Sequence, residues 1–277
     1  TDGSSMSDGY GMPATKEYIT FLGGPGTGSG GATLASKMPN QYSNKSDFAN
    51  VYNTDIYTSE GLPSDYGKGS RASNLQANFD TGVSVEFWLK KPSFDNAKTV
   101  KEIIFDLWNS GSTSAKTYGR LTIEIDGEAG ASPFRITAQS GAAPTGIFDQ
   151  TIGTTPTVAS IASWNHYAMV FQNSGSAFVT KLYVNGYLDD TKITTSTTIG
   201  DITLNSMFGR VGALLAPPNT LSASAGSGKL SGSIDEFRFW KTARDSKQIV
   251  EHWFTDVGGG TNTDISNTTL GVYYKFN

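Results

Sequence analysis

Apolar and polar residues alternate with a period of two in a series of short segments, and this pattern constrains the fold more than any other feature of the chain. In VSVEFWLKK at 83–91, the apolar residues Val83, Val85, Phe87 and Leu89 take every second position. Side chains of a strand point alternately to its two faces, so this period predicts a half-buried β-strand. Comparable apolar segments lie at 102–108, 120–126, 133–138, 164–171, 181–190 and 233–240, and a further strand is expected at 18–22.

Two local signals fix how some of these segments are connected. Asn185-Gly186 lies between two apolar runs, and this dipeptide is typical of a two-residue hairpin turn in which both positions need a positive φ. After the segment at 233–240, Asp245 can cap a helix in which Ile249, Val250, Trp253 and Phe254 recur at helical spacing. The sequence therefore predicts an all-β jelly-roll sandwich of two antiparallel sheets with one short C-terminal helix.

The chain divides into three regions of different residue composition. Residues 1–70 read as an irregular extension rich in Gly, Ser and Asn with one strand, residues 71–254 as the jelly roll, and residues 255–277 as a C-terminal strand segment. From the residues at its two ends, we expect the chain to be a piece of a longer protein. The stretch at 216–228 is expected to be a long loop, where a binding surface could lie.

Composition excludes several classes of function. The chain has 21 basic and 25 acidic residues, a net charge of −4, and no basic stripe that could neutralise phosphates, so nucleic acid is not an expected partner. It has no cysteine and only two histidines, which argues against thiolate chemistry and a zinc site. No apolar run reaches the roughly 18–20 residues that cross a bilayer, so no membrane span is expected.

Four segments, in this order, resemble the laminin G-like (LamG) branch of the concanavalin A-like lectin/glucanase superfamily. They are the strand at 83–91, WNHYAMVF at 164–171, the hairpin KLYVNG at 181–186, and GKLSGSIDEFRFWKTARDSKQIVEHW at 228–253, a closing strand and helix of which pentraxins share a version. The resemblance covers residues 71–254.

This resemblance implies recognition of glycans, proteins or lipid headgroups, often with calcium, and no catalysis. The residue composition of the chain is also similar to that of structural proteins of marine tailed phages. We therefore expect a non-catalytic structural or adhesion module of a larger virion or extracellular surface protein. It would bind glycan or protein surfaces, with Trp and Tyr side chains as anchors, and would contact other copies or structural proteins of an assembly.

A glycine-rich segment, YITFLGGPGTGSGG at 18–31, is similar to a phosphate-binding loop. In the register that begins at Gly23, however, Ser29 takes the place of the lysine and Gly30 that of the hydroxyl residue. The groups that would hold the terminal phosphates and magnesium are missing, so we interpret the segment as a glycine-rich loop.

A second alternative is a glycoside hydrolase that uses Glu124, Asp126 and Glu128. Some hydrolases of the superfamily carry E-x-D-x-E on one strand, where alternation places three carboxylates on one face. Here Gly127 begins a turn, and Glu128 is expected to leave the strand. No catalytic residue is therefore assigned.

The first alternative is a calcium-assisted carbohydrate-binding lectin. The segment from Gly209 to Ser233 lacks Asp and Glu, so the pentraxin type of calcium site is not expected, and the metal ligands stay unknown. The pair Asp189-Asp190 could bind a cation but is more typical of a solvated surface. His166 is interpreted as a hydrogen-bonded structural histidine of a core strand. Asp235 is interpreted as a buried structural residue, beside Phe237 and Phe239 by alternation and bonded to backbone amides, with a metal ligand as the lesser alternative.

Overall fold

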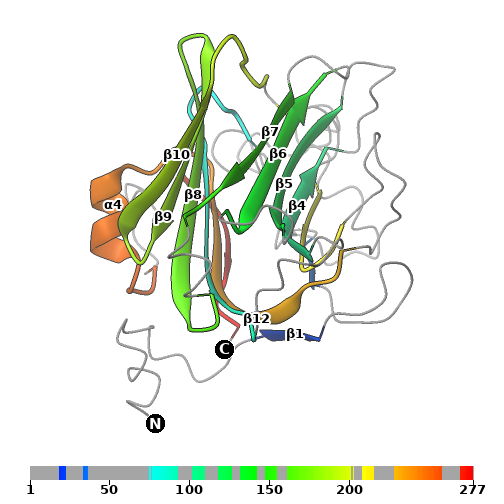
Figure 1. The fold of residues 1–277 in the computed structure, drawn as a ribbon, viewed down its shortest axis with the longest axis vertical. Helices are drawn as coiled ribbons and strands as arrows, with labels where there is room; N and C mark the ends of the chain where they lie inside the picture. The colour runs from blue at the N-terminus through cyan, green and yellow to red at the C-terminus, as the bar shows by residue number, and fades with distance from the viewer. Residues whose placement is uncertain are drawn as a thin grey trace, which may run out of the picture.

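The chain forms two antiparallel β-sheets packed face to face, as the ribbon in Figure 1 shows. The computed structural model describes residues 75, 77–92, 102–109, 118–126, 132–141, 147–154, 161–200, 202, 208–214, 228–257 and 269–276, together with two short strands near the N-terminus. Among these residues the all-β sandwich and the short C-terminal helix of the sequence prediction are both confirmed.

A seven-stranded sheet, called sheet A here, has the strand order β1-β12-β3-β8-β9-β10, and β13 also pairs with β12. A six-stranded sheet, sheet B, has the order β2-β11-β4-β5-β6-β7. The strands of sheet A are β1 (Ile19–Leu22), β3 (Val83–Lys90), β8 (Asn165–Ser174), β9 (Ala177–Val184), β10 (Tyr187–Thr194), β12 (Ser231–Trp240) and β13 (Leu270–Tyr274). Those of sheet B are β2 (Leu34–Ser36), β4 (Glu102–Trp108), β5 (Gly119–Ile125), β6 (Phe134–Ser140), β7 (Ile147–Ile152) and β11 (Phe208–Val211).

The core lies between the sheets and combines aliphatic side chains with many aromatic ones. Phe134 of sheet B meets Tyr167 of sheet A in a T-shaped contact with ring centroids 5.1 Å apart, and Phe148 meets Phe178 in the same way at 5.0 Å. Such edge-to-face pairs add about 0.5–1.5 kcal/mol to the apolar area that they bury. For β3 the alternation of the sequence identified the inner face correctly, since Val83, Val85, Phe87 and Leu89 all belong to this core.

The hairpin predicted at Asn185-Gly186 is confirmed. Both residues have positive φ, +50° and +85°, and join β9 to β10. The side chain of Asn185 accepts the amide of His166 at 2.9 Å and donates to Asn165 at 2.7 Å, so the turn is anchored to β8.

Strand β3 was predicted to be half-buried, and this was wrong. Seven of its eight residues are buried, including Ser84, Glu86 and Trp88 on the outer face of sheet A. The reason is the helix α4 (Ser246–His252), which lies on that face (Figure 1).

Helix α4 begins with the expected cap and ends earlier than expected. The carboxylate of Asp245 accepts the amide of Gln248, whose side chain bonds the amide of Asp245 in return, which is a capping box. Ile249 is buried against sheet A. Val250 and Phe254, expected on the same apolar face, are 42% and 47% exposed, because Val250 lies on a different side of α4 from the buried Ile249 and Phe254 follows the end of the helix.

Strands β1, β2 and β13 lie outside the predicted jelly-roll segment, and they pair with β12 and β11. The division of the chain at residues 70 and 254 stays a prediction. Strands β2, β7 and β11 were not predicted, because each is short or lacks a run of alternating apolar residues.

Candidate functional site

A β-bulge in β12 sets the positions of the charged residues beneath α4. The register shifts between Asp235 and Arg238, and Glu236 has a φ of +50°. Asp235 therefore lies opposite Trp88 on the outer face, away from the core-facing Phe237. The prediction that it sits beside Phe237 and Phe239 was wrong, because the extra residue of a bulge reverses the alternation. Its carboxylate does accept a backbone amide, that of Glu236, at 2.8 Å.

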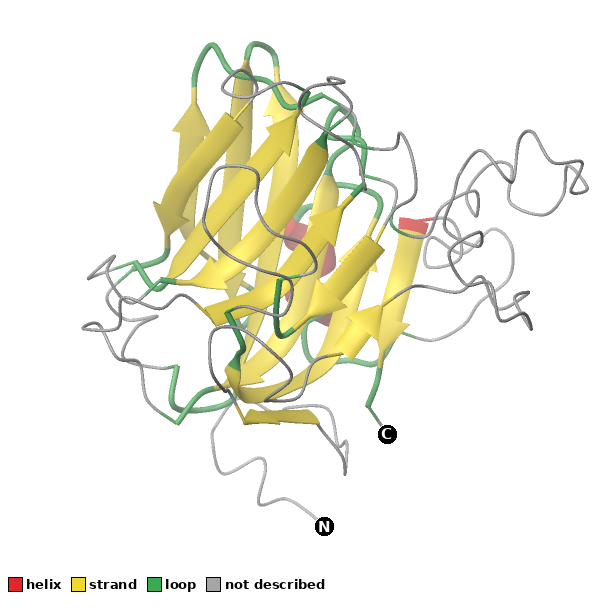
Figure 2. Ribbon diagram, turned by 90° about the vertical axis from the view of Figure 1, so that its right-hand side faces the viewer, coloured by secondary structure: helices red, strands yellow, loops and turns green. Residues whose placement is uncertain are grey.

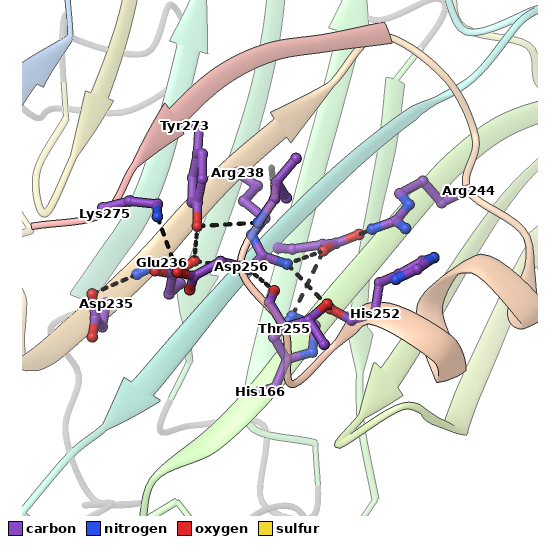
Figure 3. Close-up of polar contacts among 12 residues, drawn as sticks. His166, Asp235, Glu236, Arg238, Arg244, His252, Thr255, Asp256, Tyr273 and Lys275 are labelled. Carbon is purple, nitrogen blue, oxygen red and sulfur yellow. Dashed lines mark hydrogen bonds and ion pairs between the residues drawn. The ribbon is translucent and has the colours of Figure 1, made fainter. Parts of the chain in front are cut away.

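Glu86 is the centre of this buried cluster, which Figure 3 shows in part. Its Oε1 accepts Nη1 of Arg244 at 2.6 Å, while its Oε2 lies 3.6 Å from Nη1 of Arg238 and 3.7 Å from Nε2 of His166. Burial by itself raises the pKa of Glu86, but His166, Arg244 and Arg238 outweigh it and lower the pKa to about 2. Burial also lowers the pKa of His166, so the imidazole is neutral at pH 7.

A second part of the cluster forms around Glu236. Nη2 of Arg238 donates to Oε2 of Glu236 at 2.8 Å and to the carbonyl of Thr255 at 2.6 Å. The hydroxyl of Tyr273 donates to the same carboxylate oxygen, and burial together with this bond raises the pKa of Tyr273 (Figure 3). These bonds connect β12 to β13 and to the segment that follows α4.

The centre of the cluster is closed to solvent. The side chains of Glu86, His166, Glu236 and Arg238 are 0% exposed. A carboxylate, a neutral imidazole and a guanidinium in contact could carry out proton transfer, but general acid–base chemistry needs a substrate within hydrogen-bond reach. What this arrangement can do is hold α4 and β13 on sheet A. His166 is buried in a core strand, as expected, but within the described residues neither ring nitrogen has a hydrogen-bond partner, so the expectation of a hydrogen-bonded histidine was wrong.

The tryptophans that were expected as anchors are mostly buried. Trp88, Trp164 and Trp240 are at most 7% exposed, and Trp88 contacts Trp253 with ring centroids 5.6 Å apart. The most exposed aromatic side chain of the described residues is Tyr187, at 75%.

The acidic pair Asp189-Asp190 is bonded to the two residues that follow β7 and is not simply solvated. The carboxylate of Asp190 accepts the amide of Gly153 at 3.0 Å, and that of Asp189 accepts the amide and the hydroxyl of Thr154 at 3.1 and 2.7 Å. The pair thus connects the edges of the two sheets. Within the described residues, no group of three or more carboxylates and imidazoles is placed to hold a metal ion.

The outer face of sheet B has a different character. In Figure 2 this sheet faces the viewer, and α4 lies behind both sheets. Asp106 and Thr122 lie opposite one another on β4 and β5, so their side chains share one face. Arg120 donates two bonds to Asp106, at 2.8 and 2.6 Å, and Thr122 a third at 2.9 Å. All three residues are buried, and they form a hydrogen-bonded polar cluster on the outer side of sheet B.

The accessible part of this face lies over β6 and β7. Arg135 donates to both carboxylate oxygens of Asp149, at 2.7 and 2.8 Å, and also to Asp126 at 3.2 Å. The side chains of Arg135 and Asp149 are 31% and 40% exposed, whereas Asp126 is 2% exposed. The bond to Asp149 outweighs burial and raises the pKa of Arg135. We call Arg135 and Asp149 the β6–β7 pair.

Two of the three residues of the hydrolase alternative lie here. Glu124 is buried and lies opposite Arg135 in the register, and the Asp126 carboxylate bonds the same arginine. Glu128, the glycine-rich loop after residue 22 and the segment 216–227 lie outside the described residues.

Sequence reasoning missed Asp106, Arg120, Arg135 and Asp149. Alternation in 102–108 and 120–126 indicated which side chains share a face. The pairing partner of Arg135, however, lies on β7, which has no strong strand signal.

Comparison with known proteins places the fold. A family model described as "Concanavalin A-like lectin/glucanases superfamily" matches residues 64–250. No curated protein matches the chain. Similar solved structures include the heptameric SAP-like pentraxin of Limulus polyphemus, at 12% identity and a TM-score of 0.39 over 63% of this chain and 70% of the other.

Two further similar structures are domains LG4-5 of the mouse laminin alpha1 chain and the CBM40 of the IT-sialidase of Ruminococcus gnavus, bound to alpha2,3 sialyllactose. The laminin match has 11% identity and a TM-score of 0.39 and covers 62% of this chain and 38% of the other. The CBM40 match has 13% identity and a TM-score of 0.38 and covers 62% and 82%.

Proposed function

The chain belongs to the concanavalin A-like lectin/glucanases superfamily, and we propose that it is a non-catalytic module that binds a glycan or protein surface through the outer face of sheet B. The single observation that carries this proposal is the difference between the two outer faces. The outer face of sheet A is covered by α4 and Trp253 over β3, β8 and β9, whereas sheet B presents the partly exposed, rigidly held β6–β7 pair.

The β6–β7 pair has the chemistry that recognition of polyhydroxylated or polar surfaces needs. A guanidinium and a carboxylate side by side offer donors and acceptors in a plane. Since Arg135 is fixed by Asp149 and Asp126, little side-chain entropy would be lost when a ligand binds. The ligand would then bind through the complementarity of its surface to a rigid face of sheet B.

The absence of catalysis is also part of the proposal. A retaining or inverting hydrolase needs two carboxyl groups that reach the scissile bond. Glu124 and Asp126 are buried among the polar residues of sheet B, and Asp126 is engaged by Arg135. The hydrolase and the calcium-assisted lectin stay alternatives.

The setting that we propose is a larger extracellular or virion-surface protein. Among the described residues, no helix is long and apolar enough to cross a membrane. Mass spectrometry of the native parent protein tests this setting, because it would reveal the length of the polypeptide and the particle that carries it.

A glycan microarray with and without EDTA, followed by product analysis of each bound glycan, tests the function. The proposal expects saturable binding that is unchanged by EDTA and no cleaved product. Cleavage that is lost in Glu124→Gln would establish the hydrolase, and binding that is lost in EDTA would establish the calcium lectin. If neither glycans nor a protein partner of the parent particle bind, the proposal is wrong.

A further inference from the structure

Strand β10 is the terminal strand of sheet A on the side away from β12, and it carries exposed apolar side chains. Tyr187, Leu188 and Ile193 are 75%, 54% and 61% exposed. An edge strand presents unpaired backbone groups to which another strand can add. Exposed apolar residues on such an edge suggest an interface.

A β-bulge at Asp189 determines which side chains of β10 share a face. Leu188 lies opposite Tyr183 and Asp190 opposite Leu182, so the register skips Asp189. Tyr183 faces outward under α4, and Leu182 faces the core. Leu188, Thr191 and Ile193 therefore lie on the outer face of sheet A, and Asp190 and Lys192 on the inner side.

The strand is self-complementary about Thr191 once the bulged residue is left out. One position away from Thr191 on either side lie Asp190 and Lys192, which have opposite charges. Two positions away lie Leu188 and Ile193, which are both exposed and apolar. An antiparallel copy centred on Thr191 would therefore place acid against lysine and leucine against isoleucine, each twice.

We propose that two copies of this chain associate through β10, antiparallel and with a two-fold axis at Thr191, so that the two copies of sheet A become one continuous sheet. A two-fold interface uses the same patch on both copies, so it requires this kind of self-complementary strand. Asp190 and Lys192, already 3.0 Å apart within one chain, would join their counterparts in a cluster of two acids and two lysines.

The same features could instead protect the edge, because bulges and lysines on edge strands commonly prevent pairing. Two observations favour pairing. Lys192 is paired with Asp190 of its own chain and would also face Asp190 of the second copy, so its charge does not repel that copy. The apolar residues at both ends of β10 are left in water in the single chain. The amide of Thr191 donates to Asp190 within the chain at 2.8 Å and would exchange this bond for a backbone carbonyl of the second copy.

A single introduced cysteine tests the axis directly, because the chain has none of its own. In a hydrogen-bonded antiparallel pair the two Cα atoms are about 5.5 Å apart, within the range that a disulfide spans. Thr191→Cys is expected to form a covalent dimer of twice 29.5 kDa under mild oxidation. Lys181→Cys on the neighbouring strand β9, which is exposed and away from the edge, is the matched control and is expected to stay monomeric.

Sedimentation of reduced protein completes the test. Wild type is expected to dimerise, Ile193→Lys to be monomeric at the same concentration, and Val250→Lys, an exposed apolar residue of α4, to remain dimeric. Lys192→Glu is expected to weaken the dimer by at least tenfold, because it faces Asp190 of the second copy. Far-ultraviolet circular dichroism controls for folding. A monomeric wild type, or cysteine variants that crosslink equally, would overturn the proposal.

Discussion

Arg244 donates a hydrogen bond of 2.6 Å to Glu86, a residue 158 positions earlier in the chain, and this bond connects the segment before α4 to the centre of sheet A. Arg244 also lies over the ring of Trp240, at 4.3 Å from the centroid. Both partners of the ion pair are buried, so loss of the arginine leaves a buried carboxylate with less compensation.

Arg244→Met is therefore expected to lower the free energy of unfolding by about 3–5 kcal/mol, the usual effect of breaking a buried ion pair. Urea unfolding measures this. Lys247→Met is the matched control, since Lys247 is exposed and lies 3.9 Å from Glu251, and it is expected to change stability by less than about 0.5 kcal/mol. Equal effects of the two variants would contradict the role assigned to the cluster.

Stability is expected to fall on acidification. The pKa of Glu86 drops from 4.5 to about 2 on folding, so the stability that this group contributes is complete above pH 4.5 and is lost as the pH falls towards 2. This amounts to about 3 kcal/mol. The lowered pKa of His166 acts in the same direction below pH 6.5. Urea unfolding at a series of pH values should show a flatter profile between pH 4.5 and 2 for Glu86→Gln, whereas exposed Glu251→Gln should leave it unchanged.

Gly186 is required by both conformation and space. Its φ is +85°, and a Cβ atom there would lie 2.5 Å from Cδ1 of Trp253. Gly175 has a φ of +59° and open space around it, so it isolates the conformational effect. We expect Gly186→Ala to cost about 2–4 kcal/mol and Gly175→Ala about 1–2 kcal/mol in thermal or urea unfolding. If the two substitutions lower the free energy of unfolding equally, the contact of the hairpin with Trp253 does not contribute to stability.

The contact between β10 and β7 is expected to protect a specific amide. Asp190→Ala removes the acceptor of the Gly153 amide, so hydrogen exchange at Gly153 should become faster. Asp149→Ala, which removes an acid of β7 that bonds Arg135, is expected to leave this amide unchanged. Unaltered exchange in Asp190→Ala would mean that the bond does not persist in solution.

Much of the fold could be predicted from the sequence, because period-two alternation and the Asn185-Gly186 turn are local signals. The face of Asp235 could not, because the bulge at Glu236 depends on tertiary contacts that a period does not record. The burial of Glu86 likewise depends on α4 and on Arg244 before it, and Arg244 is 158 positions away in the sequence. The β6–β7 pair depends on β7, whose sequence IFDQTI carries little strand signal of its own.

The central claim is that the outer face of sheet B is the binding face, and calorimetric titration of a glycan or protein ligand into matched variants tests it most directly. Asp149 and Asp256 are both exposed acids in ion pairs, Asp149 on sheet B and Asp256 beside α4, where it bonds Lys275 at 3.0 Å. Asp149→Ala is expected to weaken binding at least tenfold, and Asp256→Ala to leave it within twofold of wild type. Full affinity in Asp149→Ala with loss in Asp256→Ala would contradict the claim and move the site to the α4 side.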